Sequence, residues 1–514
     1  MNYLDRSHMQ LAAIALCLSA SAVGCVVPNN EDPASGGAAG HAGTNAGGAA
    51  GAGAGGGGAS GAAGTAGVGG GGATSGGATA GGTGGAGTGG SGAGGTGGTG
   101  GGVPPCPEYN PGDATHHGYG AAVGRQNYYD DETWSAGHTY FVMGSADFQS
   151  CTLTIEAGAR VCLGEGDASP AILSMAGDST KPGKLIINGT VESPVIFSSM
   201  APGERYTGIS LNSWSQSDLN NVRIVGGGTN GLGVIRVAQD HGALVARNVS
   251  IEDFAEAALV MRNPAGLSPD SSLSISSRRA GGTEPIADVA PAAISSLTPS
   301  NLKIESTIDD QFRRIRLADG YISKSLTLSP DLGADFATKG SVEVRRTSSS
   351  DPIAVLTLEA GTRVHFDGGE LVVGTPSSTD VDGSLVAKGT AGNPVVLTSA
   401  DQNPAPGQWA GLVFQVRSMG PETDVAYLRV ENAGEDSGTS IQWCQDTVAG
   451  AIRMRGGLSA SYAGPPMQNV MIASSAGDGL AFSCGSGACL TTDYSGAVSG
   501  TDIAGKLLRP LTCP

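Results

Sequence analysis

The chain is poor in charged and aromatic side chains. Only 14% of its 514 residues are charged and 5% are aromatic, and acidic residues outnumber basic ones to give a net charge of −18. A nucleic-acid partner needs a basic surface that neutralises phosphates, so this balance excludes nucleic acid as a partner. It suits a soluble surface that repels other copies of itself. The composition does not indicate any particular oligomeric state.

Charge is missing altogether from Ala34 to Val103, which contains no Lys, Arg, Asp or Glu. Within it, Gly36–Gly102 holds 36 of the 86 glycines. Such a segment cannot bury enough apolar surface to offset its ordering entropy, so a disordered Gly/Ala/Thr-rich linker is predicted over residues 25–103. A Gly-rich coil of this length has an r.m.s. span of roughly 45–50 Å. Residues 104–514 keep an ordinary globular composition.

Long apolar runs are also lacking. The run Leu11–Val23 is too short to span a bilayer, and small residues follow it up to Ala22-Val23-Gly24-Cys25. This layout predicts a signal peptide over residues 1–24. The "AVGC" stretch resembles the bacterial lipobox, which implies that Cys25 is acylated and becomes the new N-terminus. An ordinary signal with an incidental cysteine is the alternative.

The cysteines lack the C-x₂-C spacing of a zinc site, so no metal site is predicted from them. Cys17 lies in the signal and Cys25 at the expected lipidation site. An exported chain meets an oxidising compartment, so some of the remaining seven should pair, and the odd number leaves at least one unpaired or paired between chains. The sequence does not fix the connectivity. A C-terminal staple is expected among four cysteines: Cys444, Cys484, Cys489 and Cys513.

Two nearly identical phrases lie 203 positions apart. They are "LTIEAGARVCL" (Leu153–Leu163) and "LTLEAGTRVHF" (Leu356–Phe366). The offset of further matched pieces changes only between them, so insertions fall in loops. The matched pieces are Lys184–Ser199 with Ser384–Ser399, Tyr206–Leu211 with Trp409–Phe414, Val222–Gly228 with Leu428–Gly434, Gly233–Val237 with Gly450–Met454, and Asn248–Ile251 with Asn469–Ile472.

The repeated pieces have the pattern of short strands. In Leu356-Thr357-Leu358 apolar and polar residues alternate, and Gly, Asn and Pro punctuate the gaps. Short strands with one apolar face and loops of uneven length can stack coil upon coil, with strands about 4.8 Å apart around one apolar interior. The fold class predicted is therefore all-β, a parallel β-helix. A tandem of immunoglobulin-like sandwiches is the alternative, but it would show more regular hairpins.

The order of these pieces resembles the right-handed parallel β-helix domains, pectin-lyase-like in fold, of many bacterial surface proteins. The resemblance covers most of Thr133–Cys484. Pro285–Leu297 and Phe312–Leu328 have the pattern of further coils, which favours one continuous solenoid of about twelve to sixteen coils. The expected domains are a first copy over residues 104–262, and a continuation, second copy and C-terminal cap over residues 263–514.

Two pairs of matched polar residues are candidate functional positions. Asn248 and Asn469 each precede a matched strand; each is either a ligand amide or, as favoured here, a turn residue that tolerates unusual φ and ψ. Arg236 and Arg453 hold equivalent positions that point away from the core. They are predicted to be solvated or ion-paired surface residues, with binding of an anionic sugar as the alternative.

The remaining candidates are acidic and histidine groupings. The best acidic grouping is Asp309 and Asp310 with Arg313 and Arg314, and "DDE" (Asp130–Glu132) is another. "THHG" (Thr115–Gly118) with His138 lacks further ligands at metal spacing. Glu156 and Glu359 are matched in the two phrases, where a position before a turn explains them. "MRNPAG" (Met261–Gly266) is only superficially like a lyase motif.

The function expected is that of a lipoprotein of the outer membrane or cell surface, bound to the membrane through its lipid. Its β-helix is expected to be a non-enzymatic binding or structural module for polysaccharide or cell-envelope contact. The sequence displays no convincing catalytic set, so no catalytic, cofactor-binding or metal-binding residue is predicted. The alternative is a polysaccharide lyase or glycoside hydrolase acting on acidic polysaccharide. Lyases of this fold use acids that bind calcium and an Arg base, so calcium is the cofactor that this alternative implies.

Overall fold

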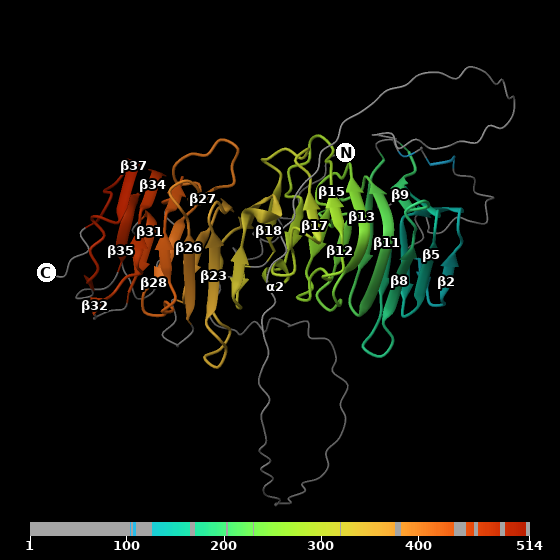
Figure 1. Ribbon diagram of the computed structural model, residues 1–514, viewed down its shortest axis with the longest axis horizontal. Helices are drawn as coiled ribbons and strands as arrows, with labels where there is room; N and C mark the ends of the chain where they lie inside the picture. The colour runs from blue at the N-terminus through green and yellow to red at the C-terminus, as the bar shows by residue number, and fades with distance from the viewer. Residues whose placement is uncertain are drawn as a thin grey trace, which may run out of the picture. The chain divides into compact units, whose positions relative to one another are not determined.

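Parallel strands make up nearly all of the regular structure in the computed structural model. The structure describes residues 103, 106–108, 126–164, 170–201, 204–229, 231–318, 320–375, 382–435, 449–456, 461–483 and 489–509. Every strand pairing within this part is parallel. Figure 1 shows the strands side by side in chain order, from β2 at one end to β37 at the other. The predicted all-β parallel β-helix is confirmed.

The largest sheet has 14 strands and runs through both copies of the repeat. Its continuity confirms the prediction of a single solenoid, and its strand number falls within the expected range of coils. Its strands are, in order, β1 (Gln126–Tyr128), β4 (Ser145–Gln149), β7 (Ala171–Ala176), β10 (Tyr206–Leu211), β12 (Ile235–Val237), β14 (Leu259–Met261), β16 (Ala287–Val289), β18 (Arg314–Leu317), β21 (Asp335–Lys339), β24 (Arg363–Asp367), β27 (Val395–Ser399), β30 (Leu428–Glu431), β34 (Val470–Ser475) and β37 (Val498–Ile503).

A 10-stranded sheet forms the other sides of the coils in the first copy. One limb joins β17 (Leu302–Ile304), β15 (Leu273–Ile275), β13 (Val245–Glu252), β11 (Ser215–Val225), β8 (Gly183–Asn188), β5 (Thr152–Glu156) and β2 (Glu132–Trp134). The other limb joins β11 to β9 (Val195–Ser199), β6 (Arg160–Gly164) and β3 (Thr139–Met143).

Two smaller sheets replace it in the second copy, and a strand pair lies near the C-terminus. The six-stranded sheet is β19 (Tyr321–Ile322), β22 (Val342–Val344), β25 (Glu370–Val373), β28 (Gly411–Gln415), β31 (Gly450–Arg455) and β35 (Asp478–Ser483). The five-stranded sheet is β20 (Leu326–Leu328), β23 (Ala354–Glu359), β26 (Gly383–Lys388), β29 (Asp424–Ala426) and β33 (Met467–Gln468). The pair is β32 (Ser461–Tyr462) with β36 (Cys489–Leu490).

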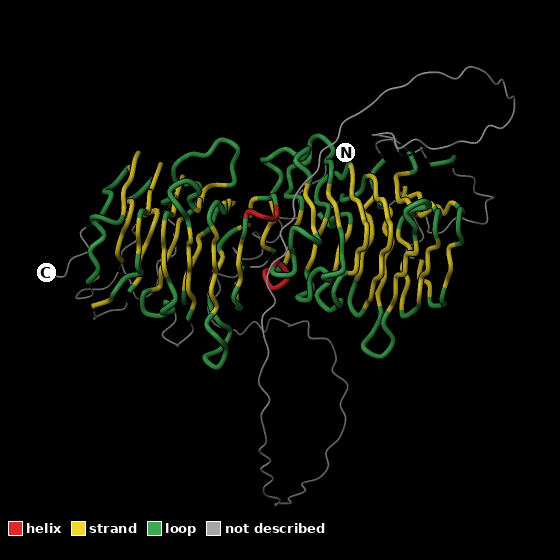
Figure 2. The backbone as a smooth tube through the Cα atoms, viewed as in Figure 1, coloured by secondary structure: helices red, strands yellow, loops and turns green. Residues whose placement is uncertain are grey.

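Two short helical turns mark the junction between the copies. They are α2 (Pro291–Ile294) and the 3₁₀ turn η1 (Pro330–Leu332). Figure 2 shows both in the middle of the row of strands. Proline stands at the first helical position of each, where its missing N–H costs no hydrogen bond. The helix α2 contacts β19 and β20, the first strands of the two smaller sheets.

The core is a stack of apolar side chains contributed by successive coils. In β23, Leu356 and Leu358 are buried while Thr357 is partly exposed, as the alternation predicts. Across the 14-stranded sheet, paired residues form an unbroken inner row. This row is Ala146, Leu173, Ile209, Ile235, Leu259, Ala287, Ile315, Phe336, Val364, Leu397, Val430 and Ile472. All of them are buried, so removing one coil would expose apolar surface of the neighbouring coil to water.

The corner asparagines are explained by backbone geometry. Asn248 and Asn469 both have a φ of 53°, in the left-handed region that Asn tolerates better than most residues. In the first copy Asn248 Nδ2 donates to Asn221 Oδ1 at 2.7 Å, and Asn221 Nδ2 donates to the Gly189 carbonyl at 3.0 Å. The interpretation as turn residues is confirmed.

The structure shows the disulfide pairing of only some of the cysteines. Cys106 forms a disulfide with Cys162, and Cys151 is buried and unpaired. Because the sequence did not fix the connectivity, the Cys106–Cys162 link is new. Cys444, Cys484 and Cys513 lie outside the described residues, as does the side chain of Cys489, so the C-terminal staple stays a prediction. The signal peptide, Cys25 and the linker up to residue 102 also lie outside the described residues.

Candidate basic pocket at the copy junction

A pocket of about 630 Å³ lies where the two copies meet. Three parts of the chain form it: the ends of β12, β14 and β16, the helix α2, and the turn between β19 and β20. The 14-stranded sheet continues through this point, but β19 is the first strand of the six-stranded sheet and lies against α2 rather than against a preceding strand. The stacking of strands on this side of the solenoid is therefore interrupted here. The interruption gives a physical reason for a hollow at this point.

The lining of this junction pocket is basic. Arg236, Arg262 and Lys324 contribute three cations, and the described lining contains no Asp or Glu. Within the part of the chain that the structure describes, no ion pair or hydrogen bond holds the side chain of Arg236 or Lys324. On a chain with a net charge of −18, cations in a pocket whose described lining holds no carboxylate suit an anionic ligand.

Arg262 is held in place by a carboxylate next to the pocket. Its Nη2 lies 3.1 Å from Asp288 Oδ2, which also accepts from Arg316 Nη2 at 2.8 Å. Arg316 in turn lies 2.6 Å from Glu284. Burial disfavours the charged form of Arg316, but its hydrogen bonds to Asp288 and Glu284 outweigh this and raise the pKa of the guanidinium. Arg262 is thus a fixed cation, whereas Arg236 and Lys324 are available to a ligand.

An aromatic side chain completes the pocket. Tyr321 is 54% exposed, unlike most large apolar side chains of the described part. The guanidinium of Arg345 lies 4.8 Å from the centre of its ring, and Arg345 Nε is 2.7 Å from Glu343 Oε2. Glu343 is also the β-ladder partner of Tyr321. Neither Arg345 nor Glu343 lines the pocket, so part of the ring stays open to it.

The best acidic grouping of the sequence, on which the alternative of a lyase or hydrolase depends, is only partly assembled. Asp310 forms an ion pair with Arg313 and is 85% exposed, and Asp309 accepts hydrogen bonds from Gln311. Arg314 instead donates to the Ala400 carbonyl at 3.0 Å. Asp310, Arg313 and Arg314 do share a pocket of about 500 Å³, but Asp309 does not line it.

That second pocket contains a histidine which sequence reasoning missed. His365, from the repeated phrase itself, has its Nε2 2.8 Å from Asp335 Oδ2 and its Nδ1 3.3 Å from the Ser399 carbonyl. Both ring nitrogens are therefore engaged, and the side chain links β21, β24 and β27. A general base needs a nitrogen that reaches the substrate, so this arrangement favours a structural role for His365.

Arg453 is ion-paired, as one form of the prediction has it, but the prediction that it lies at the surface is wrong. Its side chain is only 4% exposed, and Nη2 lies 2.6 Å from Glu370 Oε2, with Arg455 3.4 Å from the same oxygen. Residue alternation does place Arg453 away from the core, between Ile452 and Met454. That outer face is itself shielded from solvent, which alternation alone does not indicate. Its counterpart Arg236 is partly exposed, as expected.

The other polar groupings have structural roles where they are described. Asp131 accepts a hydrogen bond from the Thr152 amide at 2.7 Å, and burial raises the pKa of Glu132. The carbonyl of Glu359 accepts from Thr362 in the turn that follows β23, which confirms the turn interpretation. His138 is exposed, and Thr115–Gly118 lie outside the described residues. Asn263 of the "MRNPAG" stretch is buried and bonds to the Gly242 and Gly266 carbonyls.

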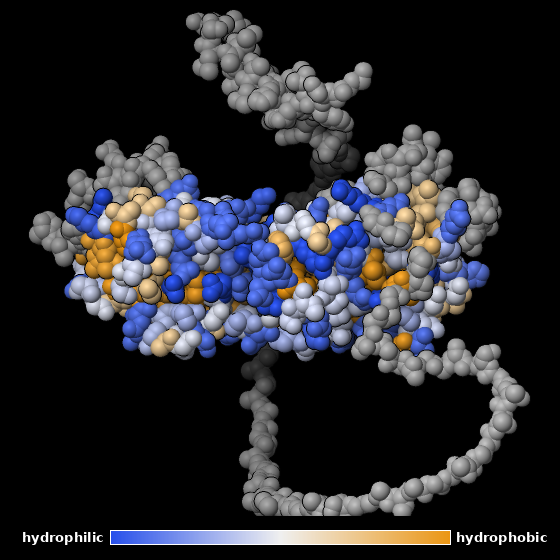
Figure 3. Space-filling model, turned by 90° about the horizontal axis from the view of Figure 1, so that it is seen from above, coloured by the Kyte–Doolittle hydropathy of each residue, from blue (hydrophilic) through white to orange (hydrophobic). Residues whose placement is uncertain are grey.

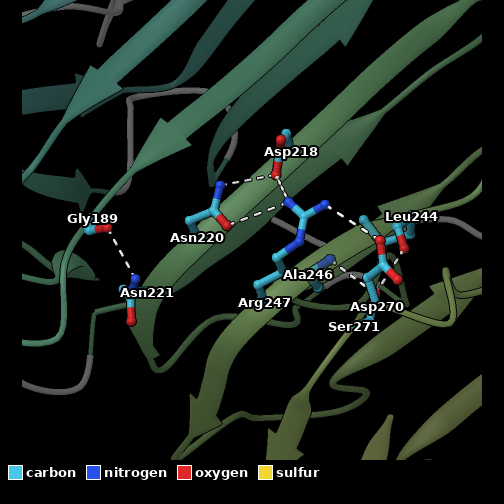
Figure 4. A network of polar contacts seen from close by, with 9 residues as sticks. All are labelled: Gly189, Asp218, Asn220, Asn221, Leu244, Ala246, Arg247, Asp270 and Ser271. Carbon is cyan, nitrogen blue, oxygen red and sulfur yellow. Dashed lines mark hydrogen bonds and ion pairs between the residues drawn. The ribbon is translucent and has the colours of Figure 1, made fainter.

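A cation on the first copy illustrates the more usual surface arrangement. Figure 4 shows Arg247 between Asp218 and Asn220 on one side and Asp270 on the other. Arg247 Nη1 is 2.5 Å from Asp218, and Nη2 is 3.7 Å from Asp270. Such exposed pairs contribute at most about 1 kcal/mol each. Arg247 is neutralised by acidic neighbours, in contrast to Arg236 and Lys324.

The face seen in Figure 3 is largely hydrophilic, with separate apolar areas rather than one continuous apolar patch. No helix in the described residues is long and apolar enough to cross a membrane. Nor do the described residues bring three or more His, Cys, Asp or Glu side chains together in a way that could hold a metal ion.

Residues 320–438 match a family model described as a pectate-lyase-like β-helix domain. With the stacked parallel sheets, this match identifies the chain as one that contains a pectate-lyase-like parallel β-helix. The matched segment includes Tyr321 and Lys324 of the junction pocket, whereas Arg236 and Arg262 precede it. No curated protein and no solved structure matched the chain.

Proposed function

We propose that the β-helix is a non-enzymatic binding module for an acidic polysaccharide, and that the junction pocket is its binding site. The observation that carries this proposal is that Arg236 and Lys324, which have no ion-pair partner among the described residues, share a pocket whose described lining holds no Asp or Glu, on a strongly acidic protein. Carboxylates pair with guanidinium groups through charge-assisted hydrogen bonds, and Arg236 has donors to spare.

A titration of the full-length protein with hexagalacturonate tests the proposal. The fully methyl-esterified hexamer has the same rings without charge and should bind at least tenfold more weakly. Arg236→Ala and Lys324→Ala should each weaken binding of the acidic hexamer by about tenfold, because a charged hydrogen bond contributes about 1.5–3 kcal/mol. Arg417→Ala and Lys388→Ala remove exposed cations elsewhere and serve as matched controls.

The same samples separate binding from catalysis. Binding without cleavage, with or without added calcium, supports the proposal. Cleavage of the hexamer that is lost in Asp310→Ala would favour the alternative of a lyase or hydrolase. Equal affinity for both hexamers, or no effect of the two pocket substitutions, would contradict a site for acidic sugars.

We further propose that the chain is a lipoprotein whose Cys25 carries the lipid and whose linker displays the β-helix at the outer membrane or cell surface. Two or more acyl chains make such an attachment durable. Metabolic labelling with a clickable fatty acid should mark the protein and should be lost in Cys25→Ala. Cys17→Ala, which alters the other N-terminal cysteine, should keep the label. Unchanged labelling of Cys25→Ala would rule out this anchor, and protease treatment of intact cells tests surface display.

A further inference from the structure

Tyr321 has the geometry of a fixed aromatic platform. It is 54% exposed at the start of the six-stranded sheet, while the next residue, Ile322, is buried in the core. An exposed tyrosine usually samples several rotamers. Here the Arg345 guanidinium lies 4.8 Å from the ring centre, and Glu343 holds that guanidinium at 2.7 Å. The cation–π contact and the ion pair stabilise this orientation of the ring.

The platform belongs to the same hollow as the free cations. Tyr321 and Lys324 lie on one turn, and Arg236 faces the same pocket from β12. Aromatic faces carry partial negative charge and attract the weakly positive C–H groups that sugar rings present on one side. A ring packed on Tyr321 would therefore bring its carboxylate into the neighbourhood of Lys324 and Arg236.

From this arrangement we infer that Tyr321 is the stacking subsite for a uronic-acid ring of the polymer, with Arg345 and Glu343 as positioning residues. The inference rests on the proposed function and adds the element that selects a sugar over another anion. Cations alone recognise any polyanion, whereas a platform beside them recognises a pyranose ring that carries a carboxylate.

Salt dependence distinguishes stacking from charge. For the full-length protein and hexagalacturonate, Tyr321→Ala should weaken binding at least tenfold and leave the slope of log affinity against log salt unchanged, since stacking is not screened. Tyr321→Phe keeps the ring and should bind within twofold of the unaltered protein. Arg236→Ala should reduce the slope. Tyr129→Ala removes a tyrosine that is 60% exposed elsewhere, and it should have no effect.

The positioning residues have their own readout. Arg345→Ala should weaken binding several-fold, and Arg345→Lys, which retains a cation near the ring, should recover part of the loss. Tyr321→Leu preserves apolar bulk at the start of β19 without an aromatic face, so it controls for local unfolding and should bind as weakly as Tyr321→Ala.

The outcomes keep the two proposals apart. If the unaltered protein binds hexagalacturonate but Tyr321→Ala or Tyr321→Leu binds within twofold of it, the stacking subsite is wrong and the basic pocket stands. A changed salt slope in Tyr321→Ala would also overturn stacking, because the tyrosine would then act through the cations. If the unaltered protein binds no hexagalacturonate, the proposed function fails and the subsite fails with it.

Discussion

The two copies of the repeat place nearly the same short sequence in different sheets. In the first copy both strands of the phrase, β5 and β6, belong to the 10-stranded sheet. In the second copy β23 belongs to the five-stranded sheet, and β24 joins the 14-stranded sheet that runs through the whole solenoid. The sequence counterpart of a strand therefore does not stack in line with it. The repeat specifies the local shape of a coil, and the junction decides which side of the next coil continues each sheet.

The corners of the coils show the same likeness and divergence. Gly189 and Gly389 occupy equivalent corners, and a Cβ on either would lie 2.2 Å or 2.3 Å from a carbonyl oxygen of the next coil, that of Asn221 or of Tyr427. Asn221 and Tyr427 both have positive φ, 49° and 50°. The backbone path is thus conserved between the copies, although an asparagine in one is a tyrosine in the other.

The largest effect is expected in the apolar stack. Ile155→Ala and Leu358→Ala remove equivalent, fully buried side chains from the two phrases, so each should lower the free energy of unfolding by about 3–4 kcal/mol. Urea denaturation measures both. Because the local packing is alike, the two losses should agree within about 1 kcal/mol. A large loss for only one variant would show that the two phrases do not pack equivalently.

The matched arginines should differ most sharply. Arg453→Ala leaves Glu370 buried with only the longer contact to Arg455, and should cost about 3 kcal/mol of stability. Arg236→Ala should change stability by less than about 0.5 kcal/mol, since this side chain is partly exposed and unpaired among the described residues. Equal losses in thermal denaturation would contradict the difference in burial.

The corner glycines should respond alike. Gly189→Ala and Gly389→Ala each place a methyl group against backbone that cannot move away easily, so each should cost about 2 kcal/mol. Gly392→Ala, where an added Cβ meets nothing within 4 Å, is the control. Unchanged denaturation midpoints for both corner variants would mean that the coils are not so closely stacked there.

The smallest effect is a gain. Tyr427→Asn puts the residue of the first copy at the same left-handed corner of the second, where Asn is better tolerated. Stability should rise by about 0.5 kcal/mol. The reverse change, Asn221→Tyr, should lower stability and also remove the hydrogen bond to the Gly189 carbonyl. A loss of stability in Tyr427→Asn would show that the contacts of the tyrosine ring stabilise the fold by more than the left-handed backbone conformation destabilises it.

Local sequence patterns predicted the strands of each coil but not which sheet each strand joins. Alternation in Leu356-Thr357-Leu358 reports which side chains enter the core, and Asn248 reports a corner, because both signals depend on adjacent residues. Which sheet receives β24 depends on pairing with β21, and nothing in the phrase itself specifies that partner. The burial of Arg453 could not be predicted for a similar reason. Alternation predicts that its side chain points away from the core, but it does not indicate whether that outer face is shielded from solvent.

The residues of the candidate site were not predicted to lie together. Arg236 was predicted to be a solvated or ion-paired surface residue, with binding of an anionic sugar as the alternative. Its meeting with Lys324 and Tyr321 requires α2 to interrupt the strands, and a helix of four residues leaves no periodic signal in the sequence. The sole available clue was Pro291, a typical first residue of a helix.

Hydrogen–deuterium exchange of the full-length protein, with and without hexagalacturonate, tests most directly whether the junction between the copies is the binding site. Protection on binding is predicted in residues 236–239, 262–264 and 321–325, and none in the second-copy counterpart of the first segment, residues 453–456. Protection confined to Asp310, Arg363 and His365, or spread evenly over both copies, would contradict a site at the junction.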